Sequence, residues 1–199
     1  MELRDAVRGR RMVRAFADAP VAPELLDELI DLARRAPSAG NVAACRFLVL
    51  DEPDDVARYW DATLPAERRA GFRWPGLVAA PALVVVAVRP ASYPERYAEP
   101  DKAATGLGEG QDRWAVPYWW VDAGAAAEHL LLGAVDAGLG ACLFGLFDHE
   151  PAVADAFGVA EGWRLVATVA LGWPAPDEPG RSAHRPRPPL DEVRRRGRW

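Results

Sequence analysis

The sequence predicts a single layered domain, spanning residues 1–199, of the α/β or α+β class. Short apolar runs typical of strands are separated by segments with helical periodicity. Half of the 199 residues are apolar, which is enough to bury one sizeable core. After Gly172 the composition becomes rich in proline and charge, so we expect residues 173–199 to form an extended C-terminal arm.

The first half of the chain is predicted to contain helices and two buried strands. The helices are expected at residues 2–8, 23–36, 54–63 and 66–72, and the strands at 46–50 and 82–88. Pro23 suits the first turn of its helix, and Pro37 stops the same helix. The run 82–88 is rich in β-branched residues and does not alternate with polar ones, which predicts a strand buried on both faces.

The second half contains a predicted helix over 119–137 that is apolar nearly all round, with Gly138 as its C-terminal cap. Such a helix lies in the centre of a protein or in a subunit interface. His129 is expected to be a hydrogen-bonded core residue rather than a catalyst, and Glu128 to be its partner or an interface residue. A strand or extended turn at 141–147, a helix at 151–157 and a strand at 164–171 follow.

Residues 89–117 form a long segment without clear periodicity. The segment is rich in proline and glycine, yet it also carries Tyr93, Tyr97 and Trp114, which argues against simple disorder. Long loops in compact domains are usually functional. We therefore expect a partly ordered lid.

Composition excludes several classes of protein. The net charge of −5 gives no basic excess for binding nucleic acid. Charged residues from Glu2 onward do not suit a signal peptide, and the most apolar stretch, 77–88, is too short to span a membrane. Cys45 and Cys142 make neither a disulfide framework nor a metal motif. We expect a cytoplasmic protein.

Two N-terminal segments point to a ligand that carries a phosphate. Arg10, Arg11 and Arg14 place three guanidiniums within five residues, and a guanidinium fork matches the oxygens of a phosphate. The turn at 37–41, Pro-Ser-Ala-Gly-Asn, has small residues where backbone amides can approach a ligand. Taken singly, the arginines also fit a solvated surface, and the turn also fits an ordinary helix stop.

Together these segments resemble the N-terminal signature of the FMN-dependent nitroreductase family. Further matches lie at Gly138-Leu139-Gly140, at Leu143-Phe144-Gly145, and at Arg185 and Arg187 before Pro189-Leu190-Asp191. The resemblance extends from about residue 3 to residue 193. It implies an α+β, three-layer fold with a central mixed, mainly antiparallel sheet flanked by helices. It also implies an arm-exchanged homodimer with two FMN sites at the interface.

The family's binding pattern assigns a role to each matching position. Arg10, Arg11, Arg185 and Arg187 would surround the phosphate, and Arg14, with Arg73 as a second contact, would lie near the pyrimidine side of the ring. The amides of Phe144 and Gly145 would approach N5, while the 37–41 turn would reach the partner subunit's flavin. The implied FMN contacts are Arg10, Arg11, Met12, Arg14, Pro37, Ser38, Asn41, Arg73, Leu143, Phe144, Gly145, Arg185 and Arg187.

Two departures from the family pattern concern the site. Met12 stands where many members have Ser or Thr, and a thioether cannot donate to a phosphate. After Asn41, many members continue with a Gln-Pro-Trp sequence, whereas this chain reads Val42-Ala43-Ala44-Cys45. Part of the usual polar wall of the site is therefore missing.

The resemblance implies an oxidoreductase that passes electrons from NADH or NADPH through FMN to a small organic acceptor, such as a nitroaromatic or a quinone. The expected kinetics are ping-pong, and no catalytic side chain is required because the flavin carries the redox chemistry. Two alternatives remain open. One is a specialised biosynthetic dehydrogenase or reductase, and the other is a flavin-sequestering protein with little turnover.

Overall fold

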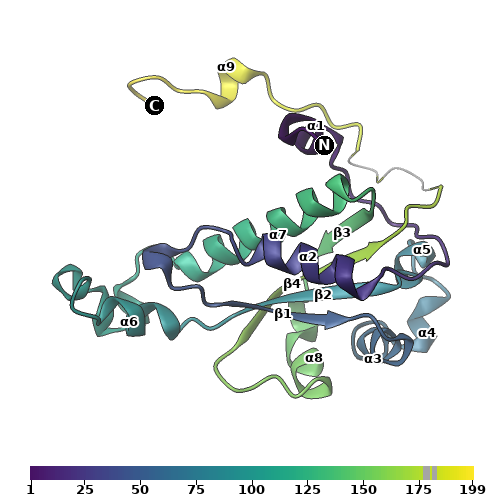
Figure 1. Cartoon of the computed structure of the whole chain (residues 1–199), viewed down its shortest axis with the longest axis horizontal. Coiled ribbons are helices and arrows are strands. Elements are labelled where there is room, and N and C mark those ends of the chain that lie inside the picture. Colours follow the sequence, from purple (N-terminus) through teal and green to yellow (C-terminus); the bar gives the residue numbers. More distant parts are fainter. Residues whose placement is uncertain (177–179, 181–182) are drawn as a thin grey trace.

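The computed structural model describes residues 1–176, 180 and 183–199. Its centre is a sheet of four strands in the order β1-β2-β4-β3, with every neighbouring pair antiparallel (Figure 1). The strands are β1 (Cys45–Leu50), β2 (Ala82–Val88), β3 (Gly140–Phe144) and β4 (Arg164–Gly172). The predicted strands are confirmed within one residue, except that 141–147 divides into β3 and a short 3₁₀ turn, Phe147–His149.

Strand β2 is the buried centre of the sheet. All seven of its residues are buried, and it pairs with β1 on one side and with β4 on the other. Because side chains alternate along a strand, Val84 and Val86 join one hydrophobic cluster while Leu83 and Val85 join the other. The expectation of a strand buried on both faces is confirmed.

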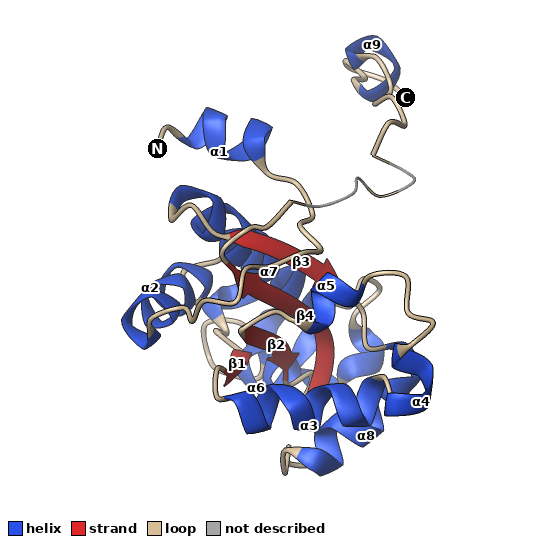
Figure 2. Cartoon of the chain, turned by 90° about the vertical axis from the view of Figure 1, so that its right-hand side faces the viewer, coloured by secondary structure: helices blue, strands red, loops and turns tan. Residues whose placement is uncertain are grey.

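Helices cover both faces of this sheet and produce three layers (Figure 2). Helices α2 (Pro23–Ala33) and α7 (Tyr118–Asp136) pack together on the face of Val84 and Val86. Helices α3 (Pro53–Thr63) and α8 (Glu150–Ala156) pack on the face of Leu83 and Val85. The α+β class and its helix-flanked antiparallel sheet are therefore confirmed.

The remaining helices are short. They are α1 (Leu3–Gly9), α4 (Ala66–Arg69), α5 (Pro75–Val78), α6 (Ser92–Tyr97) and α9 (Leu190–Val193). The helix predicted at 23–36 ends at Ala33, and the amides of Arg35 and Ala36 then make tighter bonds to the carbonyls three residues before them. The helix predicted at 66–72 is reduced to the single turn α4, and α5 was not expected.

The segment 89–117 is more regular than its sequence suggests. It contains α6 and three 3₁₀ turns, at Ala103–Thr105, Leu107–Glu109 and Gln111–Arg113. Aromatic packing holds it against α7, since the Tyr93 ring lies 5.6 Å from Trp114 and 5.7 Å from Trp119. Tertiary contacts thus give order to a segment that lacks periodicity.

Helix α7 buries one side against the sheet and exposes the other. Ala123, Leu130 and Ala134 are fully buried, whereas Val121 is half exposed. Within the part of the chain that the structure describes, no helix has the length and apolar character needed to cross a bilayer.

The C-terminal arm extends away from the layered body (Figure 1). Residues 183–199 are all exposed, and α9 is a single helical turn within them. None of the described residues beyond 180 is buried against its own chain.

Candidate functional site

The arginine-rich segment lies along the edge of the sheet, between β3 and the start of the arm. The Val13 amide donates to the Ala141 carbonyl at 2.9 Å, and Met12 forms a parallel bridge to the same strand. Further along, the Ala17 amide donates to Trp173 at 2.8 Å, and the Ala175 amide donates to Ala15 at 3.0 Å. The backbone therefore joins the two ends of the chain beside β3.

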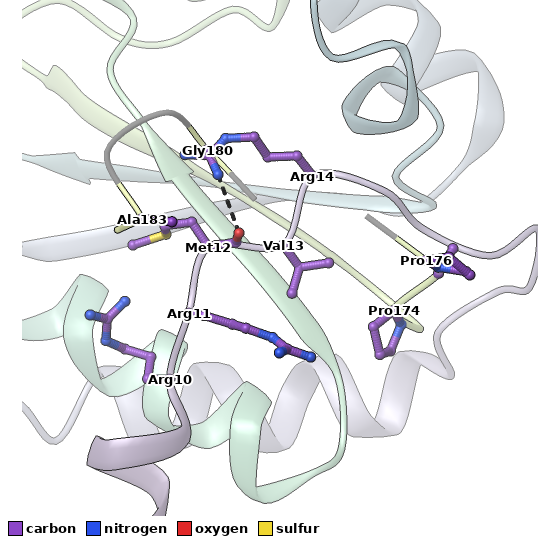
Figure 3. A pocket seen from close by; sticks show the side chains of 10 residues that line it. Arg10, Arg11, Met12, Val13, Arg14, Pro174, Pro176, Gly180 and Ala183 are labelled. Carbon is purple, nitrogen blue, oxygen red and sulfur yellow. Dashed lines mark hydrogen bonds between the residues drawn. The ribbon is translucent and has the colours of Figure 1, made fainter. Parts of the chain in front are cut away.

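A cavity of about 480 Å³ opens where these two segments meet (Figure 3). Its walls come from the N-terminal segment and from the arm. They are Arg10, Arg11, Met12, Val13, Arg14, Pro174, Ala175, Pro176, Gly180 and Ala183. The structure thus brings four predicted site residues, Arg10 to Met12 and Arg14, to one cavity.

The three arginines of the cavity have different environments. Arg10 Nε lies 3.5 Å from Glu128 Oε1 on α7, and Arg14 Nη1 donates to the Met12 carbonyl at 3.3 Å. Arg11 is exposed, and its side chain runs in a different direction from those of Arg10 and Arg14 (Figure 3). Glu128 is therefore the partner of Arg10. His129 Nδ1 instead lies 3.1 Å from the Leu32 carbonyl, so His129 is hydrogen-bonded as expected, but it is half-buried rather than a core residue.

Glycines allow the close approach of the cavity walls. A Cβ atom on Gly140 would lie 2.8 Å from Val13 Cγ1, and one on Gly180 would lie 3.3 Å from Arg14 Nη1. Gly138 has a φ of +75° and ends α7, as predicted for a C-terminal cap. The Gly138–Gly140 match therefore serves the backbone geometry next to the cavity.

Met12 has a structural role that the sequence did not reveal. Its Sδ accepts a hydrogen bond from the Leu143 amide at 3.3 Å, which ties the N-terminal segment to the end of β3. The thioether that cannot donate to a phosphate instead fixes the position of the arginines on either side of it.

Trp74 connects two of the predicted site residues. The Cζ atoms of Arg14 and Arg73 lie 5.0 Å and 4.7 Å from the centre of its ring. The ring quadrupole attracts both cations, so Arg73 and Arg14 are held close together. The contacts predicted from the sequence include Arg73 but not Trp74. The one feature of the sequence that could have indicated Trp74 is its position next to Arg73.

The 37–41 turn lies at a second cavity, of about 270 Å³, which shares no lining residue with the first. Pro37, Ser38 and Cys45 line it, and Ser38 Oγ accepts a hydrogen bond from the Ala43 amide at 3.1 Å. Asn41 is exposed and has a positive φ of 55°. Burial, followed by the charge of Asp122, raises the pKa of the Cys45 thiol to about 11.

The match at Leu143, Phe144 and Gly145 lies at the end of β3. The Phe144 ring stacks on Trp60, with ring centres 5.8 Å apart and an interplanar angle of 15°. A Cβ on Gly145 would lie 3.2 Å from the ring of Phe147, which is 86% exposed. Glycine thus lets the chain turn sharply beneath an aromatic ring at the surface.

Arg185 and Arg187 do not reach the first cavity within a single chain. Together with Pro186, Pro188, Pro189 and Glu192 they line a separate, open hollow in the arm. Their expected place at the flavin phosphate stays a prediction.

The sequence matches a profile of the nitroreductase family over residues 7–173. The chain belongs to the nitroreductase family. It is 27% identical to a 4-nitrobenzoate reductase from Nocardioides over 225 residues, which cover 93% of this chain and 85% of that protein. It is 29% identical to an NADH dehydrogenase from Thermus thermophilus over 211 residues, which cover 97% of this chain and 95% of that protein.

A solved structure shows the same fold as this nitroreductase-family chain. It is an FMN-dependent nitroreductase from Clostridium difficile, with a TM-score of 0.63 and 18% sequence identity, and the match covers 87% of this chain and 88% of that one. The family resemblance read from the motifs is confirmed, and family membership makes the chain an oxidoreductase enzyme.

The donors of this nitroreductase-family site fit the phosphate of a flavin nucleotide. Arg11 is exposed at the mouth of the first cavity, and Arg10 and Arg14 line the same wall. Guanidiniums bind phosphate through charge-assisted, bidentate hydrogen bonds. Gly180 leaves space for the Arg14 guanidinium, since a Cβ there would lie 3.3 Å from Arg14 Nη1.

Proposed function

We propose that this chain is an FMN-dependent oxidoreductase that passes electrons from NADH or NADPH to an organic acceptor, such as a nitroaromatic or a quinone, by a ping-pong mechanism. The observation that carries the proposal is the arginine-lined cavity between the N-terminal segment and the arm, in a chain of the nitroreductase family. The names of the relatives support the choice of donor, acceptor and cofactor. Bound FMN supplies the electron transfer, and the protein supplies binding and orientation.

The proposed cofactor contacts fall into three groups of residues, one for the phosphate, one for the pyrimidine side of the ring and one for the backbone next to the ring. Arg10, Arg11 and Met12 hold the phosphate end, and Arg14 with Arg73 lies at the pyrimidine side, which the shared contact with Trp74 supports. Leu143, Phe144 and Gly145 present backbone to the ring. No side-chain acid or base is required of the protein.

We also propose that the working form is a homodimer in which the arms are exchanged. The arm carries Leu190, Val193 and Trp199, all more than 60% exposed in the single chain. Burying such side chains on a second subunit releases apolar surface from water. In the dimer, Pro37, Ser38 and Asn41 meet the partner subunit's flavin, and Arg185 and Arg187 complete a phosphate site.

The acceptor side of the site is formed by small side chains. Ala43, Ala44 and Cys45 line the cavity beside Ser38, where many family members carry bulkier residues. We propose that segment 89–117 covers the flavin face and limits the size of the acceptor.

A visible spectrum of the purified protein tests the cofactor. Flavin absorbance, with FMN rather than FAD or riboflavin released on denaturation, supports the proposal, and a colourless protein that cannot be reconstituted with FMN contradicts it. Anaerobic mixing with NADH and with NADPH tests the activity, because an enzyme loses its flavin absorbance whereas a storage protein retains it. Recovery of the absorbance when p-nitrobenzoate or a quinone is added tests the acceptor, and bleaching without recovery favours a specialised reductase.

A further inference from the structure

The 89–117 segment and α7 meet the 37–41 turn through directed hydrogen bonds. Asp122 Oδ2 on α7 accepts from the Ala39 amide at 2.9 Å and from the Tyr93 hydroxyl at 2.7 Å. Arg96 Nε on α6 donates to the Gly40 carbonyl at 3.0 Å. One carboxylate thus joins three parts of the chain: the turn, α6 and α7.

Asp122 is 5% exposed, and a buried carboxylate is stable only when donors satisfy it. Its two donors come from the turn and from α6. Burial and the hydrogen bond to Asp122 both raise the pKa of Tyr93, so the hydroxyl remains protonated and donates at every physiological pH. The Tyr93–Asp122 contact is therefore a permanent link.

Arg96 is oriented by its own partners. Its Nη1 and Nη2 donate to the two carboxylate oxygens of Asp101 at 2.7 Å and 2.8 Å, and Nη1 also lies 3.1 Å from Glu99 Oε2. This bidentate pairing fixes the plane of the guanidinium and directs Nε at Gly40.

The turn has a backbone that requires such support. Gly40, Asn41 and Ala43 have φ values of 62°, 55° and 48°, in the left-handed region that costs energy for residues other than glycine. Strained conformations persist where the surroundings over-determine them. At Gly40 the fit is so close that a Cβ would lie 2.6 Å from the Tyr97 ring.

We propose that Asp122, Tyr93 and Arg96 are positioning residues that hold the 37–41 turn, and the two residues after it, in the conformation in which the turn meets the partner subunit's flavin. Segment 89–117 then acts as a fixed brace of the cofactor site, in addition to any role as its cover. This inference rests on the proposed function, because the turn needs a flavin to meet.

The test compares two hydroxyl deletions in the full-length chain. Tyr93→Phe removes the bond to Asp122, and Tyr59→Phe removes an equally short, buried bond of 2.7 Å to Thr168 on the other face of the sheet. We expect Tyr93→Phe to raise the Kd for FMN about tenfold and to speed hydrogen exchange at the amides of residues 39–43 in the flavin-free protein. Tyr59→Phe should leave the Kd and the exchange of the turn unchanged.

Variants of Asp122 and Arg96 extend the test. Asp122→Asn keeps an oxygen that can accept both hydrogen bonds, so it should weaken FMN binding less than Asp122→Ala does. Arg96→Lys loses the donor to Gly40 while keeping a cation near Asp101, and it should raise the Kd as Tyr93→Phe does. If Asp122→Ala fails to fold, Tyr93→Phe and Arg96→Lys decide the outcome.

The results separate the two hypotheses. If the wild type does not bind FMN, the proposed function fails. If the wild type binds FMN and Tyr93→Phe and Arg96→Lys bind it equally well, the brace is overturned while the proposed function stands. Equal weakening by Tyr59→Phe and Tyr93→Phe would also overturn the brace, because it would show a general loss of stability.

Discussion

In the proposed cofactor site, Arg14 is the residue whose charge would act on the bound flavin ring. Its guanidinium is close to Trp74 and Gly180, and it shares the Trp74 ring with Arg73. A nearby positive charge stabilises an ionised group and therefore favours the extra negative charge of a reduced cofactor. The place of Arg14 at the pyrimidine side of the flavin would make it a determinant of the redox potential.

We expect Arg14→Gln to lower the reduction potential of bound FMN. For a two-electron couple, about 30 mV corresponds to roughly 1.4 kcal/mol, so the loss of one partly exposed charge should shift the potential by tens of millivolts. Spectroelectrochemical titration of the FMN-loaded protein measures it, with Arg68→Gln on the exposed turn α4 as the matched control. An unchanged potential in a folded, FMN-loaded Arg14→Gln protein would remove Arg14 from this role.

Cys45 offers a chemical probe of the second cavity. Burial and the charge of Asp122 both disfavour the thiolate and raise the pKa to about 11, and Arg46 opposes them. Because only the thiolate reacts, the rate of alkylation by iodoacetamide should increase about tenfold per pH unit and level off only near pH 11. Asp122→Asn should move the midpoint of this profile to lower pH. A plateau near pH 8.5 in the wild type would contradict the assignment.

Among the elements, the predictions made from periodicity agree with the structure where the pattern is strong. The run Ala82–Val88 has no alternation and becomes β2, and Leu26, Leu29 and Ala33 of the periodic pattern in α2 are buried in the core. The helices that were missed, α5, α6 and α9, are only four, six and four residues long. Helices of that length depend on tertiary contacts, such as the packing of Tyr93 against Trp114 and Trp119, which no local pattern reveals.

The residues of the candidate site also divide into those that the sequence could predict and those that it could not. The motif residues Arg10, Arg11, Met12 and Arg14 could be found from their spacing, and they do share one cavity. Trp74 and Asp122 could not be found, since the contact of Trp74 with Arg14 and the hydrogen bonds of Asp122 join residues that are distant in the sequence. Asp122 lies 83 residues from Ala39 and 29 from Tyr93.

The start of α8 is attached to β4 by a carboxylate whose contribution depends on pH. Glu150 accepts from Arg164 at 2.7 Å and 2.8 Å and from the Leu165 amide at 2.9 Å. The Arg164 hydrogen bonds lower the pKa of Glu150, with a further contribution from the Leu165 amide. The pair therefore stabilises the fold above the usual pKa of glutamate, and this stabilisation is lost as the pH falls through the lowered pKa.

Glu150→Gln should reduce the free energy of unfolding by about 1 kcal/mol at pH 7, and the difference from the wild type should shrink below the usual pKa of glutamate and disappear below the lowered pKa of Glu150. Denaturant titrations of the wild type and of Glu150→Gln at several pH values measure this difference in the free energy of unfolding. The more exposed pair Asp61–Arg69 provides the control, because Asp61→Asn should change stability by less at every pH. A difference for Glu150→Gln that persists at pH 3 would show that the charge is not the cause.

For the whole molecule, the proposed phosphate site joins residues from opposite ends of the sequence. Arg11 lines the first cavity, while Arg187 lies on the arm, which extends away from the layered body of the same chain. We expect Arg11→Ala and Arg187→Ala each to weaken FMN binding by one to two orders of magnitude, since charge-assisted hydrogen bonds contribute about 1.5–3 kcal/mol. Riboflavin, which lacks the phosphate, should bind the wild type and both variants about equally weakly.

FMN titration and light scattering on the same samples test the site and the assembly together. Arg68→Ala, another exposed arginine, serves as the control and should bind FMN as the wild type does. If Arg187→Ala keeps the wild-type affinity for FMN, the arm is structural and the assignment of Arg187 to the phosphate site is wrong. A mass of one chain for the FMN-loaded wild type would contradict the dimer.

The pairing of residues 12–17 with Ala141 and with residues 173–175 also sets a time order during synthesis. The arginines leave the ribosome early, but the backbone that fixes them is made about 130–160 residues later, after roughly six to thirty seconds at ordinary translation rates. Contacts so distant in sequence are among the last to form when a chain folds. The arginines of the proposed flavin site are therefore held in place only after β4 and the start of the arm have been translated.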